Sequence, residues 1–153
     1  MMAVVAVGNF NPDSVVSLIR REFAAIKPVA KPTQRPTYPV PGNDTTLFSV
    51  ATDKELTSSN VQIVWKLPKR TEGTAAEYRH QLIEELADRM LNQRFTEIAQ
   101  KPDAPFLAAG AGSAGFVRGA DIYLLGANVR EGDIIKGMEG ILTEAERAAR
   151  FGF

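Results

Sequence analysis

The sequence predicts an α+β fold, an antiparallel sheet with helices packed on one face. Three observations lead to this prediction. Residues 59–68 alternate apolar and polar positions as a strand does, and residues 74–100 repeat apolar positions at helical spacing. After a proline-rich stretch, the order of elements reads β-β-α-β-β-α, preceded by a β-α unit. Short links between consecutive strands favour antiparallel pairs, and the helices then share one face of the sheet.

The first 26 residues predict one strand followed by one helix. Residues 2–7 form a continuous apolar run, which is typical of a strand buried on both faces, and Gly8 ends it. Asn11 is suited to cap a helix and Pro12 to its first position, so a helix is expected to begin there. The helix is expected to end near Ile26. A strand buried on both faces needs neighbours on both edges. We therefore expect residues 1–26 to be the terminal strand and helix of a preceding domain. The strand, without its native neighbours, is expected either to be disordered or to pair with another copy in a dimer.

Residues 27–42 predict a linker between two domains. Five prolines fall between positions 28 and 41, and few apolar residues separate them. Each proline removes a backbone donor and restrains the residue before it, so that neither a helix nor a sheet continues through this stretch. An extended, semi-rigid connection is the expected structure. The domain that follows is expected to cover residues 43–153 and to be truncated at its C-terminal end.

The first three elements of that domain are two strands and a long helix. Residues 45–52 are expected to form the first strand and residues 59–68 the second, with Trp65 in the core. Thr74 and Glu77 have the spacing of a capping box at the start of the helix. An apolar stripe is predicted to face the sheet and a polar set to lie on the opposite side. The stripe is Tyr78, Leu82, Ile83, Leu86, Met90, Leu91, Phe95 and Ile98, and the polar set is Glu84, Glu85, Asp88, Arg89, Asn92, Gln93 and Glu97.

The last elements are a strand pair and a helix. Strands are expected at residues 106–112 and 120–130, joined by a glycine-rich turn around residues 113–119, with Tyr123 in the core. Asp133 is suited to cap the final helix. Gly137 and Gly140 lie inside that helix, where each costs about 1 kcal/mol against alanine.

Composition excludes several classes of function. Lys and Arg together number 18 and so do Asp and Glu, a balance that offers no electrostatic case for nucleic acid or an anionic membrane. The absence of cysteine excludes disulfides, thiolate catalysis and cysteine metal sites. No stretch approaches the roughly 20 apolar residues of a membrane span.

Candidate metal and acid–base residues are few. His80 is the single histidine, and it stands four positions before Glu84 on a helix, a spacing that allows contact. The pair would supply two ligands, whereas catalytic zinc sites use about three protein ligands. Glu84 and Glu85 point about 100° apart on a helix and do not share a site. A solvated helix face is the preferred interpretation of all three residues.

The remaining candidates also favour structural interpretations. Ser58 and Ser59 lie far from His80 along the chain, which disfavours a serine hydrolase. Residues 8–11 lack the glycine pattern of a phosphate-binding loop, so a tight turn is preferred. Lys66, Lys69 and Arg70 form a small cluster for which a solvated face is preferred over an interface or a carboxylate contact. No residue is assigned as catalytic, cofactor-binding or metal-binding.

The order of these patterns resembles the pitrilysin family of zinc metallopeptidases, which includes insulysin and the mitochondrial processing peptidases. Residues 4–11, the strand-Gly-Asn-helix unit, resemble the end of that family's first domain. The proline-rich linker and the strand SSNVQIVWKLP at residues 58–68 resemble the start of its second domain. So do the helix through LADRMLNQRF at residues 86–95 and the strand around AAGA at residues 108–111. The resemblance covers nearly the whole chain and rests on order and pattern, because no catalytic signature is present.

The resemblance implies a non-catalytic domain. The family's inverted zinc motif, H-x-x-E-H with a further glutamate, belongs to the first domain and matches no position of this sequence. The arginine and tyrosine found in the family's C-terminal half are not matched either. The expected role is a wall of the closed peptide chamber in a zinc-dependent endopeptidase, with the parent's other domains as partners. The chain itself is expected to be inactive and to bind no zinc.

Two alternatives remain at this point. Family relatives without the zinc motif act as scaffolds or partner subunits, and the discriminating residues would lie outside this sequence. A free-standing interaction module is the second alternative. The resemblance leaves the compartment and the peptide specificity undetermined, although it favours an exported bacterial enzyme as the parent.

Overall fold

The computed structural model describes residues 3–27 and 29–153, which divide into two compact units, Met1–Pro36 and Thr37–Phe153. The first unit contains α1 (Pro12–Phe23). The Oδ1 atom of Asn11 accepts hydrogen bonds from the backbone N–H groups of Asp13 (3.0 Å) and Ser14 (3.2 Å), as its side chain and position predicted. The helix ends three residues earlier than expected, at Phe23.

The strand predicted at residues 2–7 is not present in the described part of this segment. Residues 3–7 belong to no sheet, and Met2 lies outside the described residues. Val5 and Val7 are exposed, whereas the prediction made them buried on both faces. Apolar, β-branched composition gives a strand only where another strand supplies ladder hydrogen bonds, and no described segment does so here.

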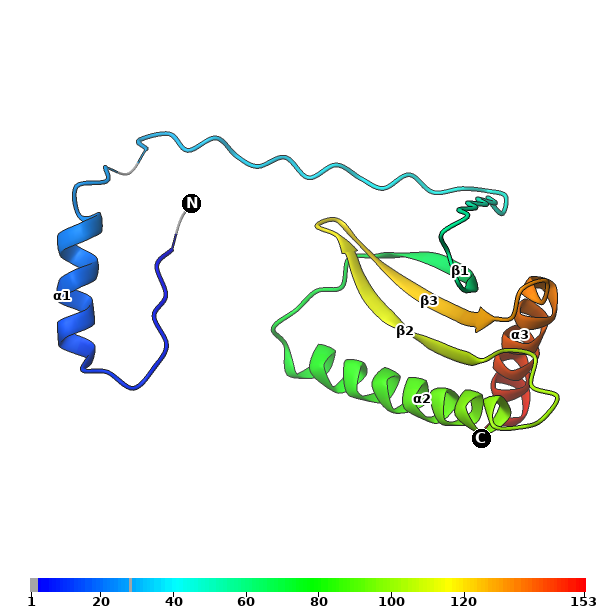
Figure 1. The fold of residues 1–153 in the computed structure, drawn as a ribbon. Helices are drawn as coiled ribbons and strands as arrows, with labels where there is room; N and C mark the ends of the chain where they lie inside the picture. The colour runs from blue at the N-terminus through cyan, green and yellow to red at the C-terminus, as the bar shows by residue number, and fades with distance from the viewer. Residues whose placement is uncertain (1–2, 28) are drawn as a thin grey trace. The chain divides into compact units, whose positions relative to one another are not determined.

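The second unit is a three-stranded antiparallel sheet covered by two helices, which confirms the predicted α+β class (Figure 1). Its elements are β1 (Ser59–Pro68), α2 (Ala75–Ala99), β2 (Ala108–Val117), β3 (Ala120–Val129) and α3 (Ile134–Phe151). The strand order is β1-β3-β2, so that β3 is central and pairs antiparallel with both neighbours. Figure 1 shows α2 and α3 on the same face of the sheet.

The core lies between this face of the sheet and the two helices. Phe95 of α2 and Phe106 are fully buried and meet edge to face, with ring centroids 5.9 Å apart. Such a pair adds about 0.5–1.5 kcal/mol to the burial of its surface. The buried residues of this cluster are Leu91, Phe95, Phe106, Leu125, Ala127, Val129 and Ile141.

The strand predicted at residues 45–52 is wrong, because the structure shows no ladder there. Leu47, Phe48 and Val50 are all more than 70% exposed. Its apolar residues have neither a paired strand nor a core to cover. The sheet therefore begins at β1, and the second unit reads β-α-β-β-α.

The hairpin between the last two strands is longer than predicted. Strand β2 runs through the expected glycine-rich turn as far as Val117, with a bulge between Gly115 and Val117, and the turn is confined to residues 118–119. A Cβ atom at Gly119 would lie 3.0 Å from Cγ2 of Thr37. The missing side chain of Gly119 therefore lets the segment at Thr37 approach the hairpin turn closely. Residues of the predicted linker thus contact the hairpin. The domain boundaries at 26/27 and 42/43 remain a prediction.

The α3 helix packs closely at two glycines, against β3 at Gly137 and against the loop before β2 at Gly140. A Cβ atom at Gly137 would stand 2.2 Å from Cγ1 of Val129, and one at Gly140 would stand 2.6 Å from Cγ of Pro105. The low helix propensity of these glycines is therefore offset by close packing, which the methyl group of alanine would prevent. Asp133 occupies the cap position but its side chain makes no capping hydrogen bond, contrary to expectation.

Candidate functional site

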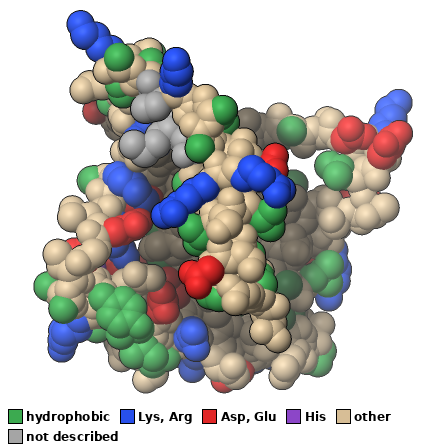
Figure 2. Space-filling model, turned by 90° about the vertical axis from the view of Figure 1, so that its left-hand side faces the viewer, with side chains coloured by type: hydrophobic (Ala, Val, Ile, Leu, Met, Phe, Trp, Pro, Cys, Tyr) green, Lys and Arg blue, Asp and Glu red, His purple; other side chains and the backbone are tan. Residues whose placement is uncertain are grey.

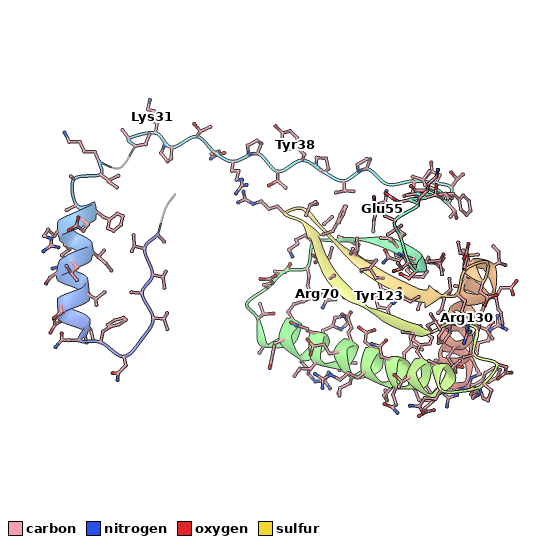
Figure 3. The ribbon with its side chains drawn as sticks, in the orientation of Figure 1. Lys31, Tyr38, Glu55, Arg70, Tyr123 and Arg130 are labelled. Carbon is pink, nitrogen blue, oxygen red and sulfur yellow. The ribbon has the colours of Figure 1, made fainter. Side chains whose placement is uncertain are left out.

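Five polar residues meet between α2 and the sheet, and we call them the polar layer: Arg70, Glu84, Asp88, Asn92 and Tyr123. Three come from α2 at four-residue spacing, one from β3 and one from the loop before α2. Figure 3 shows Arg70 and Tyr123 pointing into the space between the sheet and α2. The prediction that Glu84, Asp88 and Asn92 lie on the face of the helix away from the sheet is therefore wrong. Their common spacing was the sequence signal for a polar face directed inward.

The apolar stripe predicted for α2 is correct only near the C-terminal end of the helix. Leu91 and Phe95 are buried and Ile98 packs against the core. The other five predicted members, Tyr78, Leu82, Ile83, Leu86 and Met90, are exposed. Apolar residues lie on both sides of this helix, so the pattern alone did not determine which side meets the sheet.

Glu84 is the centre of an ion-pair cluster. Its Oε2 atom accepts a hydrogen bond from the Arg70 guanidinium, and its Oε1 atom lies 3.0 Å from Nε2 of His80. Both Arg70 and Glu84 are partly buried, and the hydrogen bond that Arg70 donates to Glu84 raises the pKa of Arg70. The predicted contact between His80 and Glu84 is present. Arg70 nevertheless occupies the other oxygen of the same carboxylate.

Tyr123 and Asp88 form the second pair of the layer. The Tyr123 hydroxyl donates to Oδ1 of Asp88 at 2.8 Å. Burial and then this hydrogen bond raise the pKa of Tyr123 well above its ordinary value, so the phenol stays protonated near neutral pH. Trp65 stands opposite Tyr123 across β1 and β3, with ring centroids 6.0 Å apart. Trp65 is 43% exposed, so its predicted place in the core is wrong.

Asn92 closes part of the free edge of β2. Its Oδ1 atom accepts from the N–H group of Ala111 at 2.7 Å, and its Nδ2 atom donates to the carbonyl of the same residue at 2.9 Å. Strand β2 is an edge strand of the sheet. The carboxamide therefore takes the place of a neighbouring strand at this one residue.

The basic cluster predicted at the end of β1 is paired rather than simply solvated. Asp121 accepts from Nζ of Lys69 and from the backbone N–H of Arg70, both at 2.9 Å. The Arg70 N–H and then Lys69 hold the pKa of the Asp121 carboxyl below its usual value. Lys66 donates to the carbonyl of Pro41 at 2.6 Å. The carboxylate contact that was the less favoured interpretation is thus the correct one for Lys69 and Arg70.

The residues described do not fit a zinc ion. No group of three His, Cys, Asp or Glu side chains that could hold a metal occurs within residues 3–27 and 29–153. The one histidine shares its carboxylate partner with an arginine, and a guanidinium cannot act as a metal ligand.

The other predicted candidates have structural places. Ser58 immediately precedes β1 and Ser59 is its first residue, whereas His80 lies on α2. At the turn after Gly8, Asn11 already occupies two of the free N–H groups that a phosphate would need.

The surface of the described residues does not have one dominant charge in the view of Figure 2, where Lys, Arg, Asp and Glu side chains are interspersed with hydrophobic ones. The sequence carries equal numbers of basic and acidic side chains. No helix within the described ranges is long and apolar enough to cross a membrane.

The fold defines an α+β domain, and the side chains of its polar layer are paired with one another or with the backbone. Residues 1–150 match the model of the peptidase M16 inactive domain, and the chain belongs to this family. The resemblance to the pitrilysin-type zinc proteases that the sequence suggested is confirmed.

A curated relative supports the same assignment, and two solved structures share the fold. A zinc protease PQQL-like protein of Arabidopsis thaliana is 36% identical over 149 residues, which are 96% of this chain and 15% of the relative. The crystal structure of the periplasmic protease PqqL from Escherichia coli superposes with a TM-score of 0.80 at 17% identity, over 95% of this chain and 16% of that protein. A structure of the first half of the same protease gives the same score and identity over 31% of its length. The chain thus spans about one-sixth of the two full-length proteins.

Proposed function

We propose that this chain is the non-catalytic domain of a longer zinc-dependent endopeptidase, in which it forms part of the wall of a chamber that encloses peptides. The match of residues 1–150 to the peptidase M16 inactive domain supports the proposal most directly. The relative from Arabidopsis thaliana is described as a zinc protease. We call the longer protein the parent. Its partners would be its own remaining domains and the peptide substrate.

The geometry of the polar layer supports the proposal that bond cleavage belongs to other residues of the parent. Hydrolysis of a peptide needs an activated water or nucleophile and a base that is free to take a proton. In the polar layer, Glu84 is held by Arg70 and Asp88 by the Tyr123 hydroxyl. These carboxylates hold the helix to the sheet and to the loop before it. In the parent, zinc would be bound by residues that this chain does not carry.

The test compares the 153-residue chain with the parent. The chain alone should cleave no peptide and should hold no stoichiometric zinc after dialysis, as measured by peptide hydrolysis and atomic absorption. The parent should cleave unfolded peptides and lose this activity with a chelator. Tyr123→Phe in the parent is the matched variant, because it alters a paired residue of the wall and should leave kcat within about twofold. Chelator-sensitive cleavage by the isolated chain would contradict the proposal.

Two other functions correspond to different outcomes, one of this comparison and one of sequencing the source gene. A parent without chelator-sensitive cleavage would be a scaffold or partner subunit of the same family. A source gene that encodes only these 153 residues would make the chain a free-standing interaction module. A location outside the cytoplasm is proposed on the single ground that the structurally similar PqqL is described as periplasmic.

Association through residues 3–7 is a further part of the proposal. These residues are exposed and belong to no helix or sheet, and Val5 and Val7 offer apolar, β-branched side chains to a second strand. A concentration-dependent dimer that Val5→Lys abolishes would support it. A monomer at all concentrations in sedimentation would contradict it.

A further inference from the structure

The side of α2 that faces away from the sheet carries an exposed apolar row. We call Leu82, Ile83, Leu86 and Met90 the outer ridge, and their exposed fractions range from 41% to 61%. Leu86 and the buried Phe95 are nine positions apart, which is about 900° of helical rotation and places them on opposite sides. The helix is thus apolar both toward its own core and away from it. A helix that is apolar on both sides is typical of one buried on both sides.

The C-terminal end of the outer ridge continues into a shallow groove of about 350 Å³. The groove is lined by Leu86, Arg89, Met90, Gln93, Arg94 and Phe153. Leu82, Leu86 and Met90 follow one another at four-residue steps, which is the row that packs against the corresponding row of another helix. The ridge and groove therefore fit the side of a helix.

The charges beside the ridge indicate the chemistry of the occupant. Arg79 and Arg89 lie along the outer side of α2, and neither forms an ion pair with any described residue. The acidic side chains of the helix surface have partners of their own, since Gln81 donates to Glu85 and Gln93 to Glu97. A segment that covers the ridge would therefore be favoured if it brought carboxylates to the two arginines.

We propose that the outer ridge is the docking surface for an amphipathic helix from the remaining polypeptide of the parent, with an apolar row against Leu82, Leu86 and Met90 and acidic residues facing Arg79 and Arg89. The proposal depends on the proposed function only in requiring a longer parent. The full-length proteins that this chain matches contain about six times its length, so such a segment has room to exist. A second copy of the chain is a poorer occupant, because it would add two more arginines to the same interface.

Thiol labelling tests this surface directly, because the chain contains no cysteine. Leu86→Cys is introduced into the 153-residue chain and into the parent, and its rate of reaction with a maleimide is measured. Glu131→Cys, in the exposed turn before α3, supplies the reference rate in each protein. Relative to that reference, Leu86→Cys should react at least about tenfold more slowly in the parent, because access there requires local opening. Equal relative rates in the two proteins would overturn the proposal.

A second variant covers the case in which the cysteine substitution disturbs packing. Arg89→Glu should lower the thermal midpoint of the parent and leave that of the 153-residue chain unchanged, because its carboxylate partners exist only in the parent. No difference between the two proteins would contradict the charge assignment. Slow labelling already in the 153-residue chain, together with a dimer in sedimentation, would assign the ridge to a second copy and overturn the proposed occupant. Absence of peptidase activity in the parent would end the proposed function without altering these readouts.

Discussion

Asn92 and Ala111 are joined by two hydrogen bonds, one in each direction, between a helix side chain and the backbone of an edge strand. Helix α2 is thereby fixed to β2 at one residue of the sheet edge. The contact also removes one N–H and one carbonyl from the edge that another chain could pair with. Asn92 thus both fixes the position of α2 against the sheet and protects part of the free edge of β2.

Replacing Asn92 with alanine should destabilise the chain by about 1–3 kcal/mol, because two partly buried backbone groups lose their partner. The measurement is the free energy of unfolding in urea. Gln93→Ala is the control on the next helical position, where the side chain is exposed and its hydrogen bond is long at 3.4 Å. The control should change stability by less than about 0.5 kcal/mol. Equal effects at the two positions would show that the carboxamide bridge contributes nothing specific.

Gly137→Ala should lower stability although alanine is the better helix former. The gain in helix propensity is about 1 kcal/mol, and a forced overlap in a packed core costs about 1–3 kcal/mol. A Cβ atom 2.2 Å from Cγ1 of Val129 forces either the Val129 side chain or α3 to shift. Gly42→Ala is the control, because nothing lies within 4 Å of a Cβ atom there.

The partner in this overlap can be tested by a double variant. Val129→Ala removes the methyl group that Gly137→Ala would meet, so the two substitutions together should cost less than the sum of their separate costs. Unfolding free energies of the four proteins give the coupling. Strict additivity, or a Gly137→Ala chain more stable than the original, would contradict the packing explanation.

Glu144→Gln should be much more destabilising than Glu146→Gln, although both residues lie on α3 and both pair with arginines. Glu144 is buried and receives Arg94 of α2 at 2.8 Å and Arg147 at 2.9 Å, whereas the side chain of Glu146 is 58% exposed. Loss of the buried charge should cost about 1–3 kcal/mol, because both arginines are partly exposed and recover some hydration. The exposed pair should contribute less than about 1 kcal/mol. Similar unfolding midpoints for the two variants would contradict this difference.

Acid should destabilise the chain partly through Asp121. The N–H of Arg70 and the ammonium of Lys69 hold the folded-state pKa of this carboxyl below its unfolded value. The contribution of Asp121 to the free energy of unfolding is therefore fully present above its pKa in the unfolded state, near 3.9. It is lost as the pH falls through the lower pKa of the folded state. Urea midpoints at pH 7 and at pH 2 should differ less for Asp121→Asn than for the original chain. Asp103→Asn, which removes a carboxylate from the exposed loop after α2, should leave that difference unchanged.

The sequence by itself determined the features that depend on neighbouring residues. Asn11 and Thr74 cap their helices through hydrogen bonds that span two or three positions. Of the predicted capping box, only the half made by Thr74 forms. The Glu77 carboxylate lies 3.7 Å from Nε of Arg70, a residue outside the helix. The family was also readable from the order of strand, helix and linker, since such an order survives changes in individual residues.

Only the tertiary structure decided which side of α2 faces the sheet. The helix offers apolar residues on two sides, and the choice depended on Tyr123 and Ala111, which lie 35 and 19 positions from their partners Asp88 and Asn92. Partners so distant cannot be read from helical spacing. The same limit applies to residues 45–52, which have the composition of a strand but no neighbouring strand to pair with. It applies also to the glycines of α3, which allow close contact with Val129 and Pro105. Local hydrogen bonds and periodicity fix the elements, whereas their orientation depends on contacts that exist only after the chain has folded.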